Sequence, residues 1–322
     1  MQAIVVHETG GPEVMRLEER PLPAPGPGQV RVKIAAAGVN FVDIYERIGL
    51  YKVSLPNVPG GEGAGTVDAV GEGVAGFKPG DRVTFLSGQG TYAEYALVPA
   101  RWLVILPAGV SFEMGAAVMI QGLTAFFLSH ETYRLQPGDR CLVHAAAGGV
   151  GLLLCQMAKM AGAYVIGTTS TEEKAAAARA AGANEVILYT QQDFEAEVKR
   201  ITGGEGVQVV YDSVGKDTFD KSLNCLVPRG MLVSFGQSSG AVPPFDILRL
   251  GGLKSAYLSR PSIFGYVQQP GEYLKYANTV FDWIALGRLK VRIDRTYPLA
   301  QAGDAHIALA SRATSGKVLL QP

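Results

Sequence analysis

The chain has 322 residues, of which 48% are hydrophobic and 18% are charged, a composition typical of a globular protein large enough for two domains. Its 29 basic residues balance 29 acidic ones, so no overall field draws it to nucleic acid or to an anionic membrane. The opening stretch Met1 to Glu8 has neither a basic start nor a long apolar run, unlike a secretory signal. We expect a cytoplasmic protein without nucleic-acid or membrane partners.

Residues 1–122 are rich in glycine, proline and short β-branched runs. Turn sequences such as Pro25–Gly28 and Lys78–Asp81 separate these runs. Short strands at this spacing predict a compact β-barrel or β-sandwich. The predicted strands are Gln2–Val6, Val30–Ile34, Gly65–Val70, Arg82–Leu86 and Tyr92–Val98.

From Cys141 the pattern changes to alternating strands and helices. Cys141–His144 predicts a short buried strand, Leu152–Ala161 a helix that Gly162 ends, and Tyr164–Gly167 the following strand. The uncharged run Cys141–Ala158 is as long as a membrane span, but three glycines interrupt it. We interpret the run as a buried turn between a strand and a helix.

That turn carries the pattern A-x-G-x-x-G, formed by Ala146, Gly148 and Gly151. In a strand-turn-helix unit the second position lets the backbone approach a pyrophosphate, and the third lets the helix pack closely on the strand. Free amides at the helix start attract the diphosphate. The turn therefore predicts a nicotinamide dinucleotide site, the alternative being an ordinary glycine turn.

The second strand of this unit ends without an acidic residue. An NAD site usually places Asp or Glu there, whereas this chain runs through the neutral hydroxyls of residues 168–171. Ser170 and Glu173 form a predicted capping box for an Ala-rich helix that Gly182 ends, which places Lys174 in its first turn. A cation beside neutral hydroxyls favours the 2′-phosphate of NADPH over NADH. The alternative is a solvated Lys174 paired with a neighbouring glutamate.

Further runs extend the same alternation and predict a doubly wound sheet of six parallel strands. These runs are Val186–Tyr189, Val207–Tyr211, Met231–Phe235 and Leu253–Leu258. The turns at residues 212–215 and 236–239 follow two of these strands and are expected to line the cofactor cleft, although small residues also form ordinary turns.

The tail after residue 265 is expected to return to the β domain. Its predicted elements are the helix Gly271–Leu286, the strand Tyr297–Leu299, the helix Ala300–Ser311 and the strand Lys317–Leu320. We therefore predict one domain from residues 1–122 and 266–322, and a second from residues 123–265. The three cysteines are interpreted as reduced core residues, and the four histidines, including His144, as structural.

Several motifs are spread along the whole chain: Gly10–Val14, Gly38–Asp43, Pro59–Gly65, His144–Gly151, Tyr211–Gly215 and Ser311–Thr314. Together they resemble the zinc-independent, zeta-crystallin-like quinone oxidoreductases of the medium-chain dehydrogenase/reductase superfamily. This resemblance implies a GroES-like β-barrel catalytic domain, a doubly wound six-strand Rossmann domain, NADPH and a homodimer.

Asn40 and Gly61 match the positions that hold catalytic zinc in related alcohol dehydrogenases. Without thiolate and imidazole, Glu62 alone is an insufficient ligand set, so no metal site is expected. Without a Lewis acid, the favoured reaction is hydride addition to a quinone or enone, whose delocalised enolate needs only hydrogen-bond donors. The expected partner is a small-molecule quinone or enone acceptor.

The resemblance implies a catalytic group of Asn40, Asp43, Tyr45 and Tyr51 near the nicotinamide, with Tyr51 as a candidate proton donor. Alternatively, Asp43 caps a helix, the tyrosines pack as half-buried aromatics, and water supplies the proton.

The residues expected to bind the cofactor come from the turn motif and from the resemblance. Thr124 is placed at the nicotinamide ribose, Tyr189 at the adenosine and Arg312 at the phosphates, although Arg312 is alternatively a helix-end cation. The full set is Asn40, Tyr45, Thr124, Ala147, Gly148, Gly149, Val150, Gly167, Thr168, Ser170, Lys174, Tyr189, Ser213, Phe235, Gly236, Gln237, Ser238, Phe264, Gly265, Tyr266 and Arg312.

Two other functions remain open from the sequence. One is an enoyl-thioester reductase of the same superfamily, which requires a cationic channel for its carrier arm. The other is a non-catalytic NADPH-binding protein of the crystallin type or one that contacts RNA. The apolar run Leu253–Leu258 at the predicted sheet edge is the candidate pairing surface of the homodimer.

Overall fold

The computed structural model describes residues 1–87, 89–269 and 271–322. The chain divides into two compact units. The β-rich unit comprises Met1–Gly122 and Tyr273–Pro322, and the α/β unit comprises Leu123–Glu272. The α/β unit thus ends at Glu272, whereas the sequence placed the end of that domain at residue 265.

The β-rich unit is built on a sheet in the order β14-β15-β3-β4-β5-β7, with β6 also paired to β3, and on a separate hairpin of β1 and β2. The strands are β1 Gln2–Val6, β2 Met15–Glu19, β3 Gln29–Val39, β4 Glu62–Val70, β5 Arg82–Leu86, β6 Tyr95–Pro99, β7 Leu103–Ile105, β14 Ile293–Pro298 and β15 Lys317–Gln321. Its helices are α1 Phe41–Arg47, α2 Phe112–Phe127, α9 Glu272–Ala285 and α10 Ala302–Ala310, with 3-10 turns η1 Pro12–Val14, η2 Ala100–Trp102 and η4 Leu299–Gln301.

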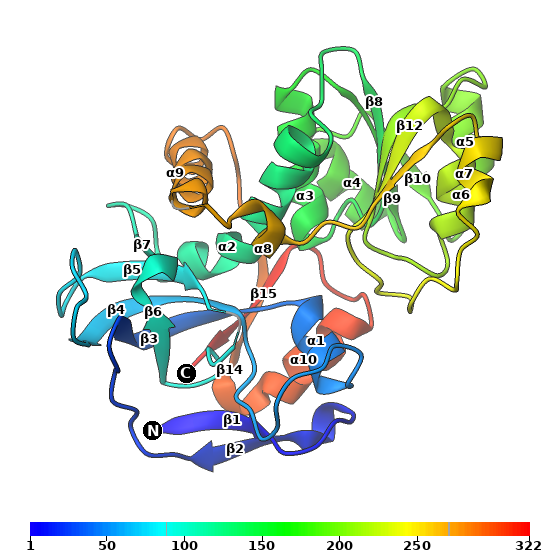
Figure 1. The fold of residues 1–322 in the computed structure, drawn as a ribbon. Coiled ribbons are helices and arrows are strands. Elements are labelled where there is room, and N and C mark those ends of the chain that lie inside the picture. The colour runs from blue at the N-terminus through cyan, green and yellow to red at the C-terminus, as the bar shows by residue number, and fades with distance from the viewer. Residues whose placement is uncertain (88, 270) are drawn as a thin grey trace. The chain divides into compact units, whose positions relative to one another are not determined.

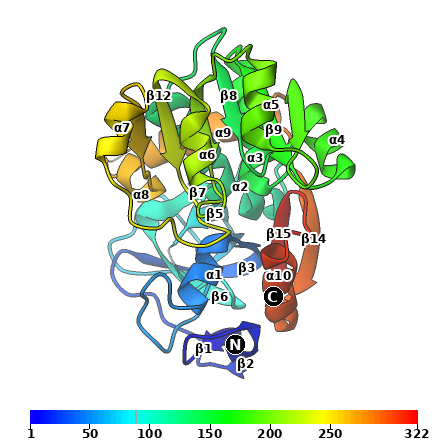
Figure 2. The same cartoon turned by 90° about the vertical axis from the view of Figure 1, so that its right-hand side faces the viewer.

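The long strand β3 organises this unit, because it pairs with β4, β6 and β15. Along its first half buried residues alternate with more exposed ones, the period expected of a strand with one face on the core. β15 runs antiparallel to β3, so residues from the two ends of the sequence become neighbours. Helices α1 and α10 lie side by side above the β1-β2 hairpin (Figures 1 and 2).

The α/β unit contains one parallel sheet in the order β10-β9-β8-β11-β12-β13. This arrangement confirms the predicted six-strand doubly wound fold. The strands are β8 Arg140–Val143, β9 Tyr164–Thr169, β10 Glu185–Leu188, β11 Val207–Asp212, β12 Leu226–Ser234 and β13 Tyr257–Ser259. The helices are α3 Gly149–Met160, α4 Glu172–Ala180, α5 Phe194–Ile201, α6 Phe219–Asn224, α7 Leu248–Gly252 and α8 Ile263–Tyr266, with a π-helical turn η3 Leu128–Thr132.

Helices cover both faces of this sheet, with α3 and α4 on one side and α5 and α6 on the other (Figure 1). The central strands are apolar because both of their faces are buried, as in other parallel sheets. Strand β8 lies next to β11, so the connections leave in opposite directions on either side of this pair. Ligands of such sheets bind beyond the carboxyl ends of the strands at this switch point.

The prediction of a strand over Leu253–Leu258 was wrong at its start. Helix α7 ends at Gly252, and Lys254 and Ser255 have φ of 59° and 60°, a left-handed conformation that an extended strand does not contain. The strand begins only at Tyr257. Local backbone geometry of this kind is not visible in an apolar run.

Sequence periodicity also did not reveal α2, which is apolar on most of its circumference. Together with η3, it forms an apolar segment from Phe112 to Thr132 that is long enough to cross a membrane by length and composition alone. Within the fold, 72% of its most apolar window is buried, and core helices of globular proteins pass the same test.

Candidate functional site

The turn after β8 leaves the start of α3 open. Gly148 is the N-cap of α3 and therefore provides no side chain to bond the first amides of the helix. Ala145 has φ of 50°, and the amide of Ala146 donates to the carbonyl of Thr168 at 3.0 Å. The backbone of the turn is thus fixed by β9, while the first-turn amides of α3 lack a side-chain cap. Such a helix start binds anions.

Glycine at two positions of this turn is required by close backbone approach. A Cβ at Gly151 would lie 2.8 Å from the Cα of Ala146, and one at Gly167 would lie 2.8 Å from the Cβ of Ala146. No such contact is tolerated between real side chains and backbone. The α3 start therefore lies directly against the ends of β8 and β9, as the A-x-G-x-x-G motif predicted.

A second turn, at residues 212–215, is organised by the buried carboxylate of Asp212. Its Oδ1 accepts from the amides of Val214 at 2.7 Å and Gly215 at 3.1 Å, and its Oδ2 accepts from Thr218 Oγ1 at 2.8 Å. Sequence analysis assigned this turn to the cleft but did not identify the role of Asp212. An acidic residue at the end of an apolar strand, just before small residues, is the available signal.

The third turn follows β12 and lies against the second. The Ser238 amide donates to the Ser213 carbonyl at 3.1 Å, and a Cβ at Gly236 would lie 2.6 Å from that same oxygen. Phe235 donates its amide to Asp212 O at 2.8 Å. The structure therefore brings together the predicted cofactor residues Ser213, Phe235, Gly236 and Ser238, and Gln237 lies in the same loop.

The predicted capping box at the end of β9 was wrong by one residue. Thr171, not Ser170, is the N-cap of α4, and its Oγ1 accepts from the Lys174 amide at 3.3 Å. The carbonyl of Ser170 instead accepts from Thr190 Oγ1 at 2.9 Å. Only Ser170 fits the S-x-x-E pattern, because Thr171 is followed three residues later by Lys174. Either hydroxyl can serve as an N-cap, and the backbone conformation selects Thr171. Lys174 remains in the first turn of α4, as predicted.

The other predicted residues near this end of the sheet differ in exposure. Thr168 is buried, with 2% of its surface exposed, whereas Tyr189 is 39% exposed. Ser170 is half-buried. The three residues follow or end β9 and β10, which are neighbouring strands. A polar, partly open surface therefore borders the carboxyl end of β9.

His144 is a structural residue in this unit. Its Nδ1 lies 3.0 Å from Thr168 Oγ1, and its Nε2 lies 3.0 Å from Ser222 Oγ. Burial lowers its pKa below the ordinary histidine value, with the nearby Asp212 acting in the opposite direction. A neutral imidazole thus links β8 to β9 and α6, which supports the structural interpretation of His144.

The segment around α8 carries three further predicted cofactor residues. Tyr266 stacks on Phe127 with ring centroids 4.5 Å apart, and its hydroxyl accepts from Thr132 Oγ1 at 2.7 Å. Phe264 is 47% exposed. Tyr266 therefore anchors α8, while Phe264 and Gly265 lie nearer to solvent. The last residues of α2, from Leu123 on, belong to this unit, and Thr124 among them is half-buried.

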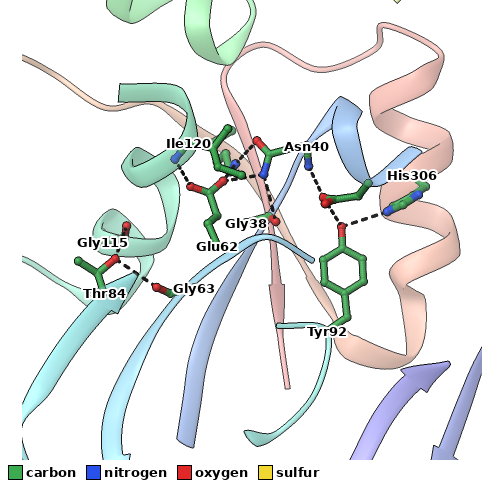
Figure 3. A network of polar contacts seen from close by, with 11 residues as sticks. Gly38, Asn40, Glu62, Gly63, Thr84, Tyr92, Gly115, Ile120 and His306 are labelled. Carbon is green, nitrogen blue, oxygen red and sulfur yellow. Dashed lines mark hydrogen bonds and ion pairs between the residues drawn. The ribbon is translucent and has the colours of Figure 1, made fainter. Parts of the chain in front are cut away.

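In the β-rich unit, three polar side chains from distant parts of the sequence meet in a buried cluster (Figure 3). Asn40 Nδ2 donates to Glu62 Oε1 at 2.7 Å, and Lys317 Nζ donates to Asn40 Oδ1 at 2.8 Å. Lys317 also forms an ion pair with Glu62 Oε1. The second carboxylate oxygen of Glu62 accepts from the Ile120 amide at 2.6 Å. Both side chains of the ion pair are fully buried.

A second buried network begins at Asp43, in the first turn of α1. Its Oδ2 accepts from the Asn40 amide at 2.8 Å and from the Tyr92 hydroxyl at 2.9 Å. The Tyr92 oxygen lies 3.0 Å from His306 Nε2, and His306 Nδ1 lies 3.1 Å from Arg47 Nη1. Because arginine only donates, His306 Nδ1 accepts and its Nε2 carries the proton. Every donor in this chain therefore points toward Asp43.

Burial controls the ionisation of this second network. It raises the pKa of Asp43 to about 7, against the hydrogen bonds from Asn40 and Tyr92 that lower it. It lowers the pKa of His306 to about 3, with Arg47 adding to the shift. It raises the pKa of Tyr92 well above its usual value. At neutral pH, His306 is therefore neutral, and Asp43 binds a proton more readily than an ordinary aspartate.

The two predicted catalytic tyrosines pack against each other. Tyr45 and Tyr51 form an edge-to-face pair with centroids 5.3 Å apart, and Tyr45 also contacts Phe41 at 6.0 Å. Tyr45 is only 7% exposed, whereas Tyr51 is half-buried. Of the two, Tyr51 is more accessible to a ligand. Arg312, predicted at the phosphates, follows α10 in this unit and is exposed, with φ of 59°.

The residues at the positions that match zinc ligands do not fit a zinc ion. Asn40 and Glu62 already bond to each other and to the Lys317 ammonium, a cation that repels a second one. Gly61 has no side chain. Within residues 1–87, 89–269 and 271–322, no group of three or more His, Cys, Asp or Glu side chains lies close enough to hold a metal.

Lys317, Tyr92 and His306 were missed as site residues by sequence reasoning. A lysine at the start of the last strand, directly before an apolar run, was the available signal, since buried lysines require a partner. The identity of that partner depends on the β15-β3 pairing, which sequence patterns do not provide.

Comparison with known proteins places these features in one family. Residues 26–108 match the alcohol dehydrogenase GroES-like domain, and residues 149–279 match the zinc-binding dehydrogenase model. Quinone oxidoreductase 1 of Escherichia coli is 46% identical over 99% of both chains. A 2-haloacrylate reductase of Burkholderia is 42% identical over 100% of this chain and 99% of that protein.

The same relationship holds between structures. The Escherichia coli quinone oxidoreductase complexed with NADPH superimposes with a TM-score of 0.98 at 45% identity, covering 100% of both chains. The chain therefore belongs to the quinone oxidoreductases of the medium-chain dehydrogenase/reductase superfamily.

Proposed function

We propose that this protein uses NADPH to reduce quinones or related α,β-unsaturated carbonyl compounds, without zinc. The observation that carries the proposal is the match, over the full length of both chains, to a quinone oxidoreductase complexed with NADPH. The α/β unit is proposed to bind the cofactor, and the β-rich unit is proposed to bind the acceptor.

The diphosphate of the cofactor is assigned to the start of α3. The backbone at Ala147, Gly148, Gly149 and Val150 forms this start, and the N-cap Gly148 places no side chain over the amides of the first helical turn. The turns at residues 212–215 and 236–239 are proposed to line the same cleft, because all three follow central strands of one parallel sheet. When bound, the nicotinamide supplies the hydride.

The 2′-phosphate is assigned to the end of β9. Ser170 follows β9, Lys174 is in the first turn of α4, and Tyr189 follows the neighbouring strand β10. Lys174→Ala is expected to raise the KM for NADPH about tenfold and to leave that for NADH nearly unchanged. Lys199→Ala, which removes an exposed lysine of α5, is the matched control. Equal effects of Lys174→Ala on both cofactors would contradict this assignment.

The catalytic group is assigned to α1 and the segment that follows it. Asn40 is proposed to hold the nicotinamide end of the cofactor, and Tyr51 to donate a hydrogen bond or proton to the acceptor carbonyl. Asp43 and Tyr45 are proposed to support them from buried positions. Tyr51→Phe should lower kcat with little change in NADPH affinity, and a variant with full turnover would exclude Tyr51 from proton donation.

The acceptor class is proposed to extend beyond quinones, because a 2-haloacrylate reductase is 42% identical. A 2-haloacrylate has a carbon-carbon double bond conjugated to a carboxylate. The β-carbon of this double bond can accept hydride in the same way as that of an enone. The test is NADPH oxidation with a panel of quinones, enones, 2-haloacrylates and enoyl thioesters, with and without a chelator. Turnover is expected with at least one of the first three classes and should be unaffected by the chelator.

Two outcomes of this panel would redirect the proposal. Selective turnover of enoyl thioesters would favour the thioester reductase. Tight NADPH binding with no acceptor reduced would favour a non-catalytic binding protein.

The assembly is proposed to be a cytoplasmic homodimer. β13 is at one edge of the six-stranded sheet, and its Tyr257 and Leu258 are 56% and 39% exposed. An open apolar edge strand pairs readily with a second copy. The three buried free cysteines accord with a reducing compartment. Sedimentation of the wild type against Leu258→Lys tests the dimer, and an unchanged dimer in that variant would exclude this edge.

A further inference from the structure

We propose that Lys317 is a positioning residue that fixes the orientation of the Asn40 carboxamide, so that Asn40 meets the cofactor as a hydrogen-bond acceptor. This inference rests on the proposed function, because it assumes that Asn40 contacts NADPH. It concerns a residue near the end of the chain that no motif of the sequence singled out.

In the cluster of Figure 3, both polar atoms of the Asn40 carboxamide have protein partners. Asn40 Nδ2 donates to Glu62 Oε1 at 2.7 Å and faces the Gly38 carbonyl at 3.4 Å. Its Oδ1 accepts from Lys317 Nζ at 2.8 Å. Both Nδ2 hydrogens therefore point at protein oxygens, and one Oδ1 lone pair is used by the ammonium.

The charges of Glu62 and Lys317 permit only one of the two orientations of the Asn40 carboxamide. A half-turn of the carboxamide would place Oδ1 against the Glu62 carboxylate and Nδ2 against the Lys317 ammonium. Both new contacts are repulsive, and both charges are fully buried, where water screens them little. Lys317 and Glu62 thus fix the amide from opposite sides.

Contacts from several helices and strands fix the cluster in place. Glu62 begins β4, and its Oε2 accepts from the Ile120 amide of α2 at 2.6 Å. Gly38 of β3 leaves room for the Glu62 side chain, because a Cβ there would meet the Glu62 Cδ at 2.6 Å. Asp43 holds the Asn40 backbone amide at 2.8 Å. Asn40 is therefore fixed at both its backbone and its side chain.

The consequence concerns the chemistry that Asn40 offers to a ligand. The second lone pair of Oδ1 is its remaining hydrogen-bonding capacity, so its ligand group must be a donor. The ribose hydroxyls and the carboxamide N–H of a nicotinamide are such donors. A buried ion pair is a weak source of stability, and in some proteins buried polar or ionic groups specify one arrangement of their surroundings.

The test compares single variants with a charge-neutral pair. Lys317→Met and Glu62→Gln each leave one buried charge, and both should lower the melting temperature strongly. The double variant Lys317→Met/Glu62→Gln removes both charges and should recover most of that loss. Lys275→Met removes an exposed lysine of α9 and should resemble the wild type in every assay.

NADPH affinity, measured by direct titration without an acceptor, separates positioning from stability. The double variant is expected to bind NADPH about tenfold more weakly, as Asn40→Ala should. Adding Asn40→Ala to the double variant should cause no further loss, because Lys317 acts through Asn40. A stable double variant with wild-type affinity would overturn the proposal, and so would losses that multiply in the triple variant.

A second measurement decides the matter if the double variant fails to fold. An atomic-resolution structure of the wild-type NADPH complex should show Asn40 Oδ1 accepting from the cofactor and from Lys317. Nδ2 donating to the cofactor would contradict the inference. A wild type that binds NADPH but reduces no acceptor would contradict the proposed function alone, since the affinity comparison still decides the role of Lys317.

Discussion

The polar regions of the two units are formed by different groups, mainly by backbone in one unit and by buried polar and charged side chains in the other. In the α/β unit the turns after β8, β11 and β12 are made mainly by backbone and small residues, within stretches of a few residues each. In the β-rich unit Asn40, Glu62 and Lys317 meet although up to 277 positions separate them. One region consists of backbone at close approach, and the other of buried charge.

Because of this difference, we expect different kinds of substitution to destabilise the two regions. A backbone turn is damaged by added atoms, because nothing near it can move cheaply. A buried charge cluster is damaged by removing one charge, because the partner is left without compensation. The following substitutions test that contrast in order of decreasing effect.

Glu62→Gln should have the largest effect on folding. It leaves the Lys317 ammonium buried without a carboxylate, and breaking such a pair costs about 3–5 kcal/mol. The free energy of unfolding from urea titration measures this cost. Glu205→Gln removes the exposed ion pair with Arg140 and should cost less than about 1 kcal/mol. Similar losses in both variants would show that burial does not distinguish them.

Asp43→Asn should change how stability depends on pH. The pKa of Asp43 is raised to about 7 in the folded state, so between pH 4 and 7 the folded protein holds a proton that the unfolded chain has released. This contribution to stability is complete below pH 4 and falls by about 1.4 kcal/mol per pH unit until pH 7, up to about 4 kcal/mol.

The measurement is the difference in unfolding free energy between the wild type and Asp43→Asn at each pH. Tyr92, Glu46 and Lys317 act on Asp43, and the depressed pKa of His306 gives the opposite trend between pH 3 and 6.5. Subtracting the two urea titrations at each pH removes the His306 contribution. A difference that is constant from pH 4 to 7 would show that Asp43 is ionised throughout.

Gly151→Ala should damage the other region by adding one carbon. Its Cβ would lie 2.8 Å from the Cα of Ala146, so the start of α3 must move, at a cost of about 2 kcal/mol. NADPH affinity should fall with stability. Gly251→Ala in α7 meets open space and should be neutral or slightly stabilising. If both glycines tolerate alanine equally, the close approach of helix and strand is not a constraint.

Sequence reasoning succeeded where the determinants are local. The alternation of strands and helices after Cys141 predicted the doubly wound sheet, the A-x-G-x-x-G turn predicted the dinucleotide site, and the missing acid after β9 predicted NADPH. Each of these signals is formed by residues that are close together in the sequence. For the β-rich unit, sequence patterns predicted strands and two helices of the tail without a pairing order, and only the resemblance implied a GroES-like barrel. The pairing of Lys317 with Glu62 follows from the β15-β3 and β3-β4 registers, which depend on long-range packing.

The smallest predicted effect separates two adjacent hydroxyls that the sequence does not distinguish. Thr171→Ala removes the N-cap of α4 and should cost about 1 kcal/mol in unfolding free energy, with a small effect on NADPH affinity. Ser170→Ala should leave stability within about 0.5 kcal/mol, because only its carbonyl accepts a bond from Thr190. Ser170→Ala should weaken the binding of NADPH more than that of NADH, because Ser170 is proposed to bond the 2′-phosphate. Urea titration measures the stability of both variants, and cofactor titration measures their affinity for NADPH and NADH. A larger loss of stability in Ser170→Ala than in Thr171→Ala would show that Ser170 is the N-cap.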